Sequence, residues 1–157
     1  MIEMKKLKLL FVLFILMYSC NSERSSEELI FIVQMNVIND KSREEIKDFS
    51  KYYTGAIKQN EPNSLGWGFY NAYGGIYNTA DRVILIERYL NEEAIMEHGK
   101  NISEGGVLEN HFKMFSKHFD IKKIDVYGNV SERLREFLGP FGLPFYFHPS
   151  LAKFSRN

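Results

Sequence analysis

The sequence predicts an α+β domain with a ferredoxin-like fold, in which the elements follow the order β-α-β-β-α-β. Four apolar segments have strand character, and two regions between them repeat their apolar residues at helical spacing. The length of 157 residues suits one domain with tails. Hydrophobic residues make up 45% and charged residues 25% of the chain, which excludes a disordered protein. We therefore expect one antiparallel sheet with both helices on one face.

The first strand and the first helix open the domain. The segment Leu29–Ile38 is apolar except at Gln34 and Asn36, which is typical of a strand that is buried on both faces. Ser42 and Glu45 have the spacing of a capping box at the start of a helix. Apolar residues then recur at helical spacing over residues 43–59, and the helix is expected to end at Glu61-Pro62-Asn63.

Two further strands follow this helix. Residues 64–72 alternate in character along their length, as a strand does, and residues 82–89 form the third strand. A turn region with Gly74, Gly75 and Asn78 lies between them. The glycines of the second strand leave room on one of its faces. One face of this strand carries Leu65, Trp67 and Phe69, and the other carries Gly66, Gly68 and Tyr70.

The second helical region is predicted in two pieces. Asn91 has the position of an N-cap for a helix over Glu92–His98, and Gly99 and the Gly105-Gly106 pair interrupt the helical pattern. The pattern resumes from Leu108 to Phe119. The remaining expected elements are a fourth strand over residues 121–127, a short helix over residues 131–138 that ends at Gly139-Pro140, and an aromatic extended tail over residues 141–148.

The first twenty residues have the features of a bacterial lipoprotein signal. Three lysines precede an unbroken apolar run, Leu9–Met17, which is too short to cross a membrane as a helix. The run is followed by Ser19-Cys20, which resembles a lipobox and implies cleavage before Cys20 and acylation of that residue. The expected parts of the chain are a signal peptide (1–19), a lipid-anchored tether (20–28), the ferredoxin-like domain (29–128), and a C-terminal helix with an aromatic tail (129–157).

The charge balance and the predicted anchor limit the partners and the location. Twenty basic and twenty acidic residues give a net charge of zero, which argues against a nucleic-acid-binding protein. Two lipid signals suffice for stable attachment to a membrane. We expect a protein held by Cys20 in the bacterial cell envelope, at the outer membrane or the periplasmic face. A single cysteine also excludes an intramolecular disulfide and a cysteine-based zinc site.

The apolar first strand predicts a homodimer. In a sheet with helices on one face only, the second face of Leu29–Ile38 needs a separate cover. The same sheet of a second subunit, related by a two-fold axis, supplies one. The aromatic tail, residues 141–147, is the other candidate cover, either within its own chain or across the dimer.

Several short segments form a pattern along the chain. They are Glu61–Leu65, Ile86–Tyr89 with Glu93-Ala94 and His98, His111-Phe112, Val126–Gly128, and a tail with Leu138–Phe141 and Phe154–Arg156. In this order they resemble the antibiotic biosynthesis monooxygenase domain of the dimeric α+β barrel superfamily. The family includes cofactor-independent oxygenases of phenols and quinols, relatives that degrade haem, and proteins without a known activity. Such a mixed family implies the fold, whereas the activity has to be argued from the site.

The resemblance implies a pocket between the sheet and the helices. There a small aromatic substrate loses a proton and reacts directly with oxygen, without a bound cofactor, so the pocket needs a base, donors for an oxyanion and an aromatic wall. His98 is the candidate base or donor, and Asn36 is the candidate polar group. The candidate substrate-binding residues are Trp67, Tyr70 and Arg88. Trp67 joins this pocket only if its strand is bulged or if the face opposite the glycines lines the cavity.

Each candidate also has a structural interpretation. His98 stands near the predicted helix end, where the helix dipole stabilises a histidinium, so its loss should change stability by about 1 kcal/mol or less. Trp67 shares a strand face with other large residues, which favours packing. The amide of Asn36 needs a defined partner, either backbone or substrate. Arg88 suits a solvated charge at a strand end, and Tyr70 suits a ring that fills the space above the glycines.

Three functions fit these residues. The first is a lipid-anchored oxygenase of a quinol-like or phenol-like molecule, and the second is a non-catalytic dimeric module that binds a small aromatic, quinone or haem-like ligand. The third, a haem-handling protein, fits less well, because the relatives that degrade haem use an Asn, a Trp and a His. Asn36 matches the Asn. Near the position of the Trp this sequence has His98, and near the position of the His it has Leu108, so the pattern is incomplete. The four histidines lack metal-site spacing, so no metal site is predicted.

Overall fold

The computed structural model describes residues 27–72 and 82–153. The predicted signal peptide, Cys20 and most of the predicted tether lie outside the described residues, as does the predicted turn region with Gly74, Gly75 and Asn78. None of the helices in the two described ranges is long and apolar enough to cross a membrane.

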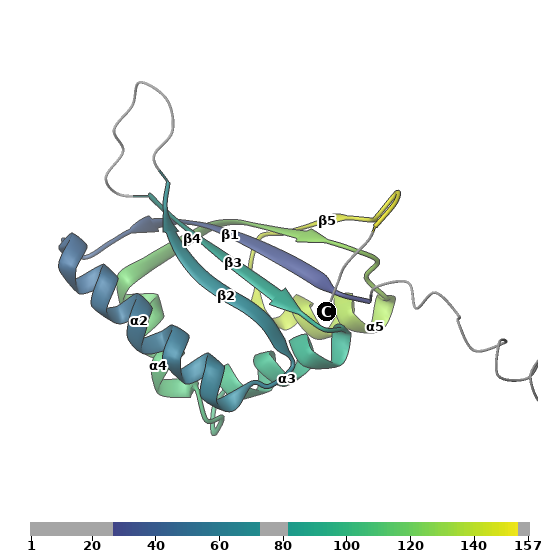
Figure 1. Cartoon of the computed structure of the whole chain (residues 1–157), viewed down its shortest axis with the longest axis horizontal. Helices are drawn as coiled ribbons and strands as arrows, with labels where there is room; N and C mark the ends of the chain where they lie inside the picture. Colours follow the sequence, from purple (N-terminus) through teal and green to yellow (C-terminus); the bar gives the residue numbers. More distant parts are fainter. Residues whose placement is uncertain (1–26, 73–81, 154–157) are drawn as a thin grey trace, which may run out of the picture.

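The described strands form one five-stranded sheet in the order β2-β3-β1-β4-β5 (Figure 1). The first four strands pair antiparallel, with β1 between β3 and β4, and this arrangement confirms the predicted ferredoxin-like sheet. The predicted extended tail supplies the fifth strand, which pairs parallel to β4. The strands are β1 (Leu29–Val37), β2 (Ser64–Asn71), β3 (Arg82–Tyr89), β4 (Phe119–Tyr127) and β5 (Phe145–His148).

Three helices lie on one face of the sheet, as Figure 1 shows. They are α2 (Arg43–Asn60), α3 (Glu92–Ile102) and α4 (Glu109–His118), and a short α5 (Glu132–Leu138) leads into a 3-10 turn, η1 (Gly139–Phe141). The predicted capping box of α2 is present, since the Ser42 hydroxyl accepts from the Glu45 N–H and the Glu45 carboxylate accepts from the Ser42 N–H. The predicted N-cap of α3 is present too, because Asn91 Oδ1 accepts from the Ala94 N–H at 3.0 Å.

Two predicted boundaries are wrong, and tertiary packing explains the first. The helix does not stop at Gly99, because α3 continues to Ile102. A Cβ at Gly99 would lie 2.6 Å from Cε1 of Phe137, so glycine stands here to let α5 pack closely against α3. The second error concerns Phe141, which was predicted to begin the extended tail but closes η1 instead, so the chain becomes a strand only at Phe145.

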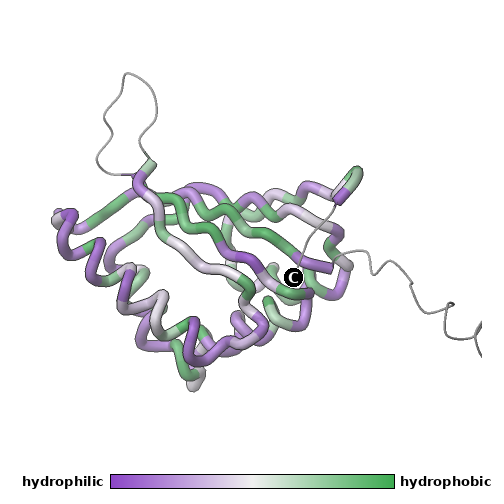
Figure 2. Tube along the Cα trace, in the orientation of Figure 1, coloured by the Kyte–Doolittle hydropathy of each residue, from purple (hydrophilic) through white to green (hydrophobic). Residues whose placement is uncertain are grey.

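The core lies between the sheet and the helices. Every second residue of β1, from Leu29 to Met35, is buried against α2, α3 and α4, and β3 alternates in the same way from Val83 to Tyr89. Figure 2 shows that β1 and most of β3 are apolar, whereas α2 mixes polar and apolar residues as a helix at a surface does. The covered face of the sheet is therefore the face that any internal site must use.

The other face of the sheet carries apolar residues that the described elements cover only in part. Ile30 and Ile32 of β1 and Ile84 and Ile86 of β3 are all half-buried within the single chain. Antiparallel pairing places Ile32 directly beside Ile86. The pairing places β5 beside β4 at one edge of the sheet, so this strand extends the sheet and does not lie over Ile32 or Ile86.

Candidate functional site

A small cavity of about 70 Å³ lies inside the domain, between the sheet and the helices. Strand residues such as Phe31, Glu87 and Tyr89 form one side, and His98 of α3 and Phe112 of α4 form part of another. The C-terminal segment closes the remaining side. Its contributing residues are Leu138, Phe141, Leu143 and Phe145. The lining is thus almost entirely apolar, with a carboxyl, a phenol and an imidazole as its polar groups, which is the usual composition of a binding site.

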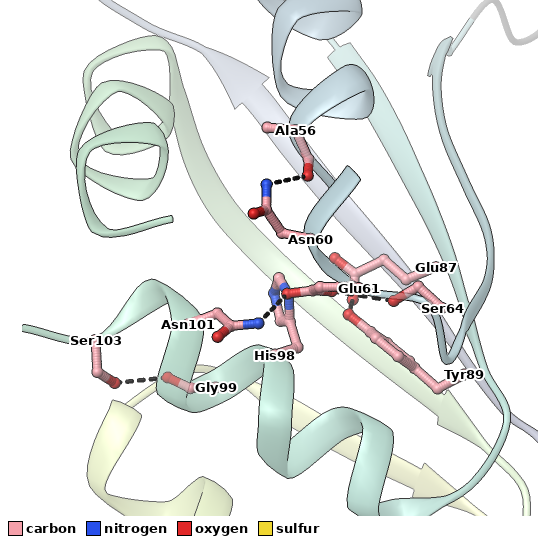
Figure 3. A network of polar contacts seen from close by, with 10 residues as sticks. All are labelled: Ala56, Asn60, Glu61, Ser64, Glu87, Tyr89, His98, Gly99, Asn101 and Ser103. Atoms are coloured by element: carbon pink, nitrogen blue, oxygen red, sulfur yellow. Dashed lines mark hydrogen bonds and ion pairs between the residues drawn. The ribbon is translucent and has the colours of Figure 1, made fainter. Parts of the chain in front are cut away.

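His98 forms a buried pair with Glu61, the residue that follows α2 (Figure 3). The ring atom Nδ1 of His98 lies 2.9 Å from Glu61 Oε1 and 3.1 Å from Oε2. Glu61 is only 4% exposed, and its carboxylate also accepts from the Asn101 amide at 3.1 Å and from the Ser64 hydroxyl at 3.0 Å. An ionised carboxylate only accepts hydrogen bonds, so Nδ1 of His98 carries the proton, and Nε2 is the basic atom of the neutral ring.

The pair shifts the pKa of each partner toward its charged form. Burial by itself raises the pKa of Glu61, but the hydrogen bond and charge of His98 outweigh burial and hold that pKa below its usual value. Burial by itself lowers the pKa of His98, and the hydrogen bond to Glu61, together with the charge of that carboxylate, raises it above 6.5. Glu61 therefore makes His98 a stronger base than a histidine in water.

A second buried carboxyl, Glu87 of β3, lies beside this pair (Figure 3). Its Oε2 accepts a hydrogen bond from the Tyr89 hydroxyl at 2.9 Å, and the side chain has no cation as a direct partner among the described residues. Burial raises the pKa of Glu87 to about 7, although the nearby charge of His98 acts in the opposite direction. Glu87 is thus a carboxyl that is able to hold a proton near neutral pH and to donate it.

The rings of Trp67 on β2 and Tyr89 on β3 lie close to the His98 ring. The Trp67 ring lies 5.2 Å from the His98 ring and 5.6 Å from the Tyr53 ring, measured between centroids. The indole N–H of Trp67 is buried and has no acceptor within the described part of the chain. A buried donor without a partner is rare in folded proteins, although Trp67 is not among the residues that line the cavity.

The structure brings only two of the five sequence-predicted pocket residues together. His98 and Trp67 share the covered face of the sheet, whereas Asn36, Tyr70 and Arg88 alternate onto the opposite face. The face of β2 opposite the glycines is therefore the face that the helices cover, but Trp67 is not among the residues that line the cavity. A pocket that joins all five side chains on one side of the sheet is not present in the described residues.

The glycine face of β2 is filled by its neighbours. A Cβ at Gly68 would lie 2.9 Å from the Tyr70 hydroxyl, and a Cβ at Gly66 would lie 3.4 Å from Cδ of Arg88. Arg88 Nε in turn pairs with the Glu28 carboxylate at 2.6 Å. Gly68 thus makes room for the Tyr70 ring, whereas a Cβ at Gly66 would make only ordinary van der Waals contact with the Arg88 stem.

Two residues of the site, Glu61 and Glu87, were not among the sequence candidates. Glu87 carried a signal, because alternation along β3 puts it on the same face as Leu85 and Tyr89, where an acidic residue is unexpected. Glu61 opens one of the segments that match the family, but its position before Pro62 was interpreted only as the end of a helix. Within residues 27–72 and 82–153, no group of three or more potential metal ligands comes together.

Comparison with known proteins identifies the fold. A scan against models of protein families and a search of curated protein sequences both find no match. Among solved structures, MupZ from Pseudomonas fluorescens is similar at 19% identity, with a TM-score of 0.51 over 83% of this chain and 95% of MupZ. SnoaB, a cofactor-independent oxygenase from Streptomyces nogalater, is similar at 10% identity, with a TM-score of 0.50 over 67% of this chain and 95% of SnoaB. This chain therefore has the ferredoxin-like α+β barrel fold of these proteins.

Proposed function

We propose that the protein is a cofactor-independent monooxygenase of a small phenol-like or quinol-like molecule, and that His98 is its base. The observation that carries this proposal is the pair formed by Glu61 and His98 at the wall of an apolar cavity. A carboxylate fixed on Nδ1 orients the ring and strengthens Nε2 as a base, which is what deprotonation of a phenol requires. The fold shared with SnoaB, a cofactor-independent oxygenase, supports the same reaction class.

The chemistry balances with dioxygen as the only co-reactant. For a phenol with a free para carbon, Nε2 of His98 takes the hydroxyl proton, and the phenolate gives one electron to dioxygen. The two radicals join at the para carbon, and His98 returns its proton to the distal oxygen. His98 then removes the hydrogen from the para carbon as the O–O bond breaks. One oxygen atom becomes the new quinone carbonyl, and the other leaves as water with the proton that His98 releases.

Two further groups of the site suit this sequence of steps. Glu87 in its protonated form is a donor for the oxygen anion that develops on the substrate, as neutral buried carboxyls are in other active sites. Its hydroxyl partner Tyr89 lines the same cavity and holds the carboxyl in place.

Substrate entry requires movement of the C-terminal segment. A volume of about 70 Å³ corresponds to roughly two water molecules, since water occupies about 30 Å³ in the liquid. An aromatic substrate needs several times this space. Displacing Phe141 and Leu143 by a few ångströms opens the cavity without disturbing the strands that hold Glu87 and Tyr89.

The direct test is oxygenation of 1-naphthol by the full chain under ¹⁸O₂. We expect 1,4-naphthoquinone with one labelled oxygen atom and one labelled water molecule for each dioxygen consumed. We also expect the rate to exceed that of the uncatalysed reaction. Menadiol serves as a quinol probe in the same assay. Saturable binding of both probes without turnover would contradict the enzyme proposal and would favour the non-catalytic binding module. The three protein groups that hydrogen-bond to Glu61 are also consistent with that module.

We also propose that two copies pack through the face of the sheet that the helices leave open. The motivation is the group of half-buried isoleucines on that face, because a monomer rarely exposes so contiguous an apolar surface. Light scattering of residues 25–157 should give about twice the monomer mass at micromolar concentration. Ile32→Glu should halve that mass, because it places a charge at the centre of the interface. A monomeric wild-type protein would contradict the dimer.

The lipid anchor at Cys20 stays a prediction that a labelling experiment decides. The Lys-rich start, the apolar run and Ser19-Cys20 motivate it. Cys20→Ser should abolish incorporation of a palmitate analogue and leave a longer, unprocessed precursor on a denaturing gel. Labelling that survives in the Ser variant would contradict the anchor.

A further inference from the structure

We propose a second binding site, a groove between α2 and the free edge of β2, that takes an elongated amphipathic anion with an apolar chain and a carboxylate or phosphate end. The groove has a volume of about 700 Å³, which lies within the range of small-molecule sites. It shares no lining residue with the cavity that contains His98. The site is therefore independent of the proposed oxygenase.

The floor of the groove is apolar and its position follows from the sheet order. β2 is an edge strand of the described sheet, so α2 packs against it without a further strand beyond. Ile46 of α2, Phe69 of β2 and Val83 of β3 form the floor. Tyr70, which is 55% exposed and lies on the opposite face of the strand from Phe69, also lines the groove. The groove thus wraps the edge of the sheet and presents an apolar surface to a ligand.

The rim of the groove has one sign of charge. Five basic side chains and no acidic side chain are among its described lining residues, although the whole chain is neutral. Lys47, Lys51 and Lys58 stand along one side of α2. Two of the five basic groups also have acidic neighbours on the helix surface, since Lys51 lies 3.6 Å from Asp48 and Lys41 lies 3.0 Å from Glu45, and solvent screens such surface pairs. An anion bound over the floor would meet several ammonium groups, and the complementarity of charge selects an anionic ligand.

The shape of the groove selects an elongated ligand. Its helix residues extend from Arg43 to Lys58, a stretch of about 22 Å at 1.5 Å per residue. Small side chains on that face, Ser50, Thr54 and Gly55, leave the space open. A Cβ at Gly55 would meet no atom within 4 Å, so this glycine is not required by packing and marks empty volume in the middle of the groove.

The test is a titration of the full chain with octanoate, in which binding is measured by calorimetry and by saturation-transfer NMR. The proposal expects saturable binding of one octanoate that weakens as salt is added, and binding of neutral octanamide at least tenfold weaker. Gly55→Leu should abolish octanoate binding because the new side chain fills the groove. The fold should survive this change, since the position is open and leucine is a better helix former than glycine.

The charge requirement is tested with two matched sets of substitutions. Replacing Lys47, Lys51 and Lys58 by Gln should weaken octanoate binding roughly tenfold, through the loss of three exposed charges. Replacing Lys100, Lys117 and Lys122 by Gln makes the same change of net charge outside the groove and should leave binding unaltered. Absence of binding, equal binding by wild type and Gly55→Leu, or equal effects of the two lysine sets would each overturn the site. Lysine-dependent binding to anionic phosphatidylglycerol vesicles without octanoate binding would also overturn it.

Discussion

His98→Ala is expected to lower the rate of 1-naphthol oxygenation by about 10²–10⁴-fold, the usual contribution of one general base. The variant removes the only histidine that lines the cavity in the described residues, while Glu87 and Tyr89 stay in place. Added imidazole should restore part of the rate, because the vacated space admits a small base. The measurement is oxygen uptake with ¹⁸O analysis of the product, per mole of folded protein.

The structure changes what His98→Ala is expected to do to stability. The sequence placed this residue at a helix end, with a contribution of about 1 kcal/mol or less, whereas it lies inside α3 and pairs with a buried carboxylate. Removing one partner of a buried pair costs about 3–5 kcal/mol, because Glu61 loses its cation and keeps only the hydrogen bonds from Asn101 and Ser64. Rates must therefore be measured well below the melting temperature of the variant.

His111→Ala is the matched control. His111 is a partly buried histidine of α4 that stacks on Tyr52 and Tyr53, at centroid distances of 4.6 and 5.7 Å, and does not line the cavity. Its loss should also lower the melting temperature, but the rate per folded molecule should stay at the wild-type value. If folded His98→Ala keeps the wild-type rate, or if both variants lose the same fraction of it, His98 is a structural residue and the oxygenase proposal fails.

Glu87→Gln is expected to stabilise the protein at alkaline pH and to flatten the dependence of its stability on pH. Burial raises the pKa of Glu87 in the folded protein to about 7, from a usual value of 4.5. The folded state therefore binds this proton more tightly than the unfolded state. Stability from this group is complete below about pH 4.5 and is lost as the pH rises through 7. The loss is about 3 kcal/mol, since one pKa unit corresponds to about 1.4 kcal/mol.

Thermal unfolding of Glu87→Gln at pH 5 and pH 8 measures this effect. The glutamine keeps the volume of the side chain and its acceptor for the Tyr89 hydroxyl, but it does not ionise. We expect a gain in melting temperature on the order of 10 °C at pH 8 and little change at pH 5. Glu97→Gln, an exposed substitution on α3, is the control and should leave both values unchanged. If the melting temperature of Glu87→Gln changes with pH as it does in the wild type, then Glu87 is ionised in the folded protein from pH 5 to pH 8. The raised pKa of His98 acts in the same direction in the wild type and in both variants, and Glu87→Gln removes the part of that rise which the Glu87 charge causes.

The helices and strands could be predicted from the sequence because the residue patterns that indicate them are local. The capping box at Ser42 and the N-cap at Asn91 marked two helix starts that the structure contains. The break expected at Gly99 failed because its cause is not local, since Phe137 of a later helix needs the space of the missing side chain. A residue pattern close to a glycine gives no sign of such a distant contact.

The site was harder to predict because it depends on which face of the sheet the helices cover. Alternation separated Trp67 from Tyr70, but it did not say which of the two points into the core. The pairing of Glu61 with His98 joins residues 37 positions apart, and only the packing of α3 against the end of α2 brings them together. The family resemblance pointed to His98, and the structure adds the Glu61 carboxylate that raises its pKa.

The parallel strand β5 has a consequence for how the protein is made. Parallel pairing needs a crossover connection, which α5 and η1 provide here. Residues between 138 and 145 therefore close the cavity only after the chain has returned to pair with β4. A ribosome delivers the chain from its N-terminus, and Glu61, Glu87 and His98 leave it well before those residues. The nascent domain therefore presents an open apolar pocket to chaperones and solvent, and the cavity closes only when synthesis has passed the last strand.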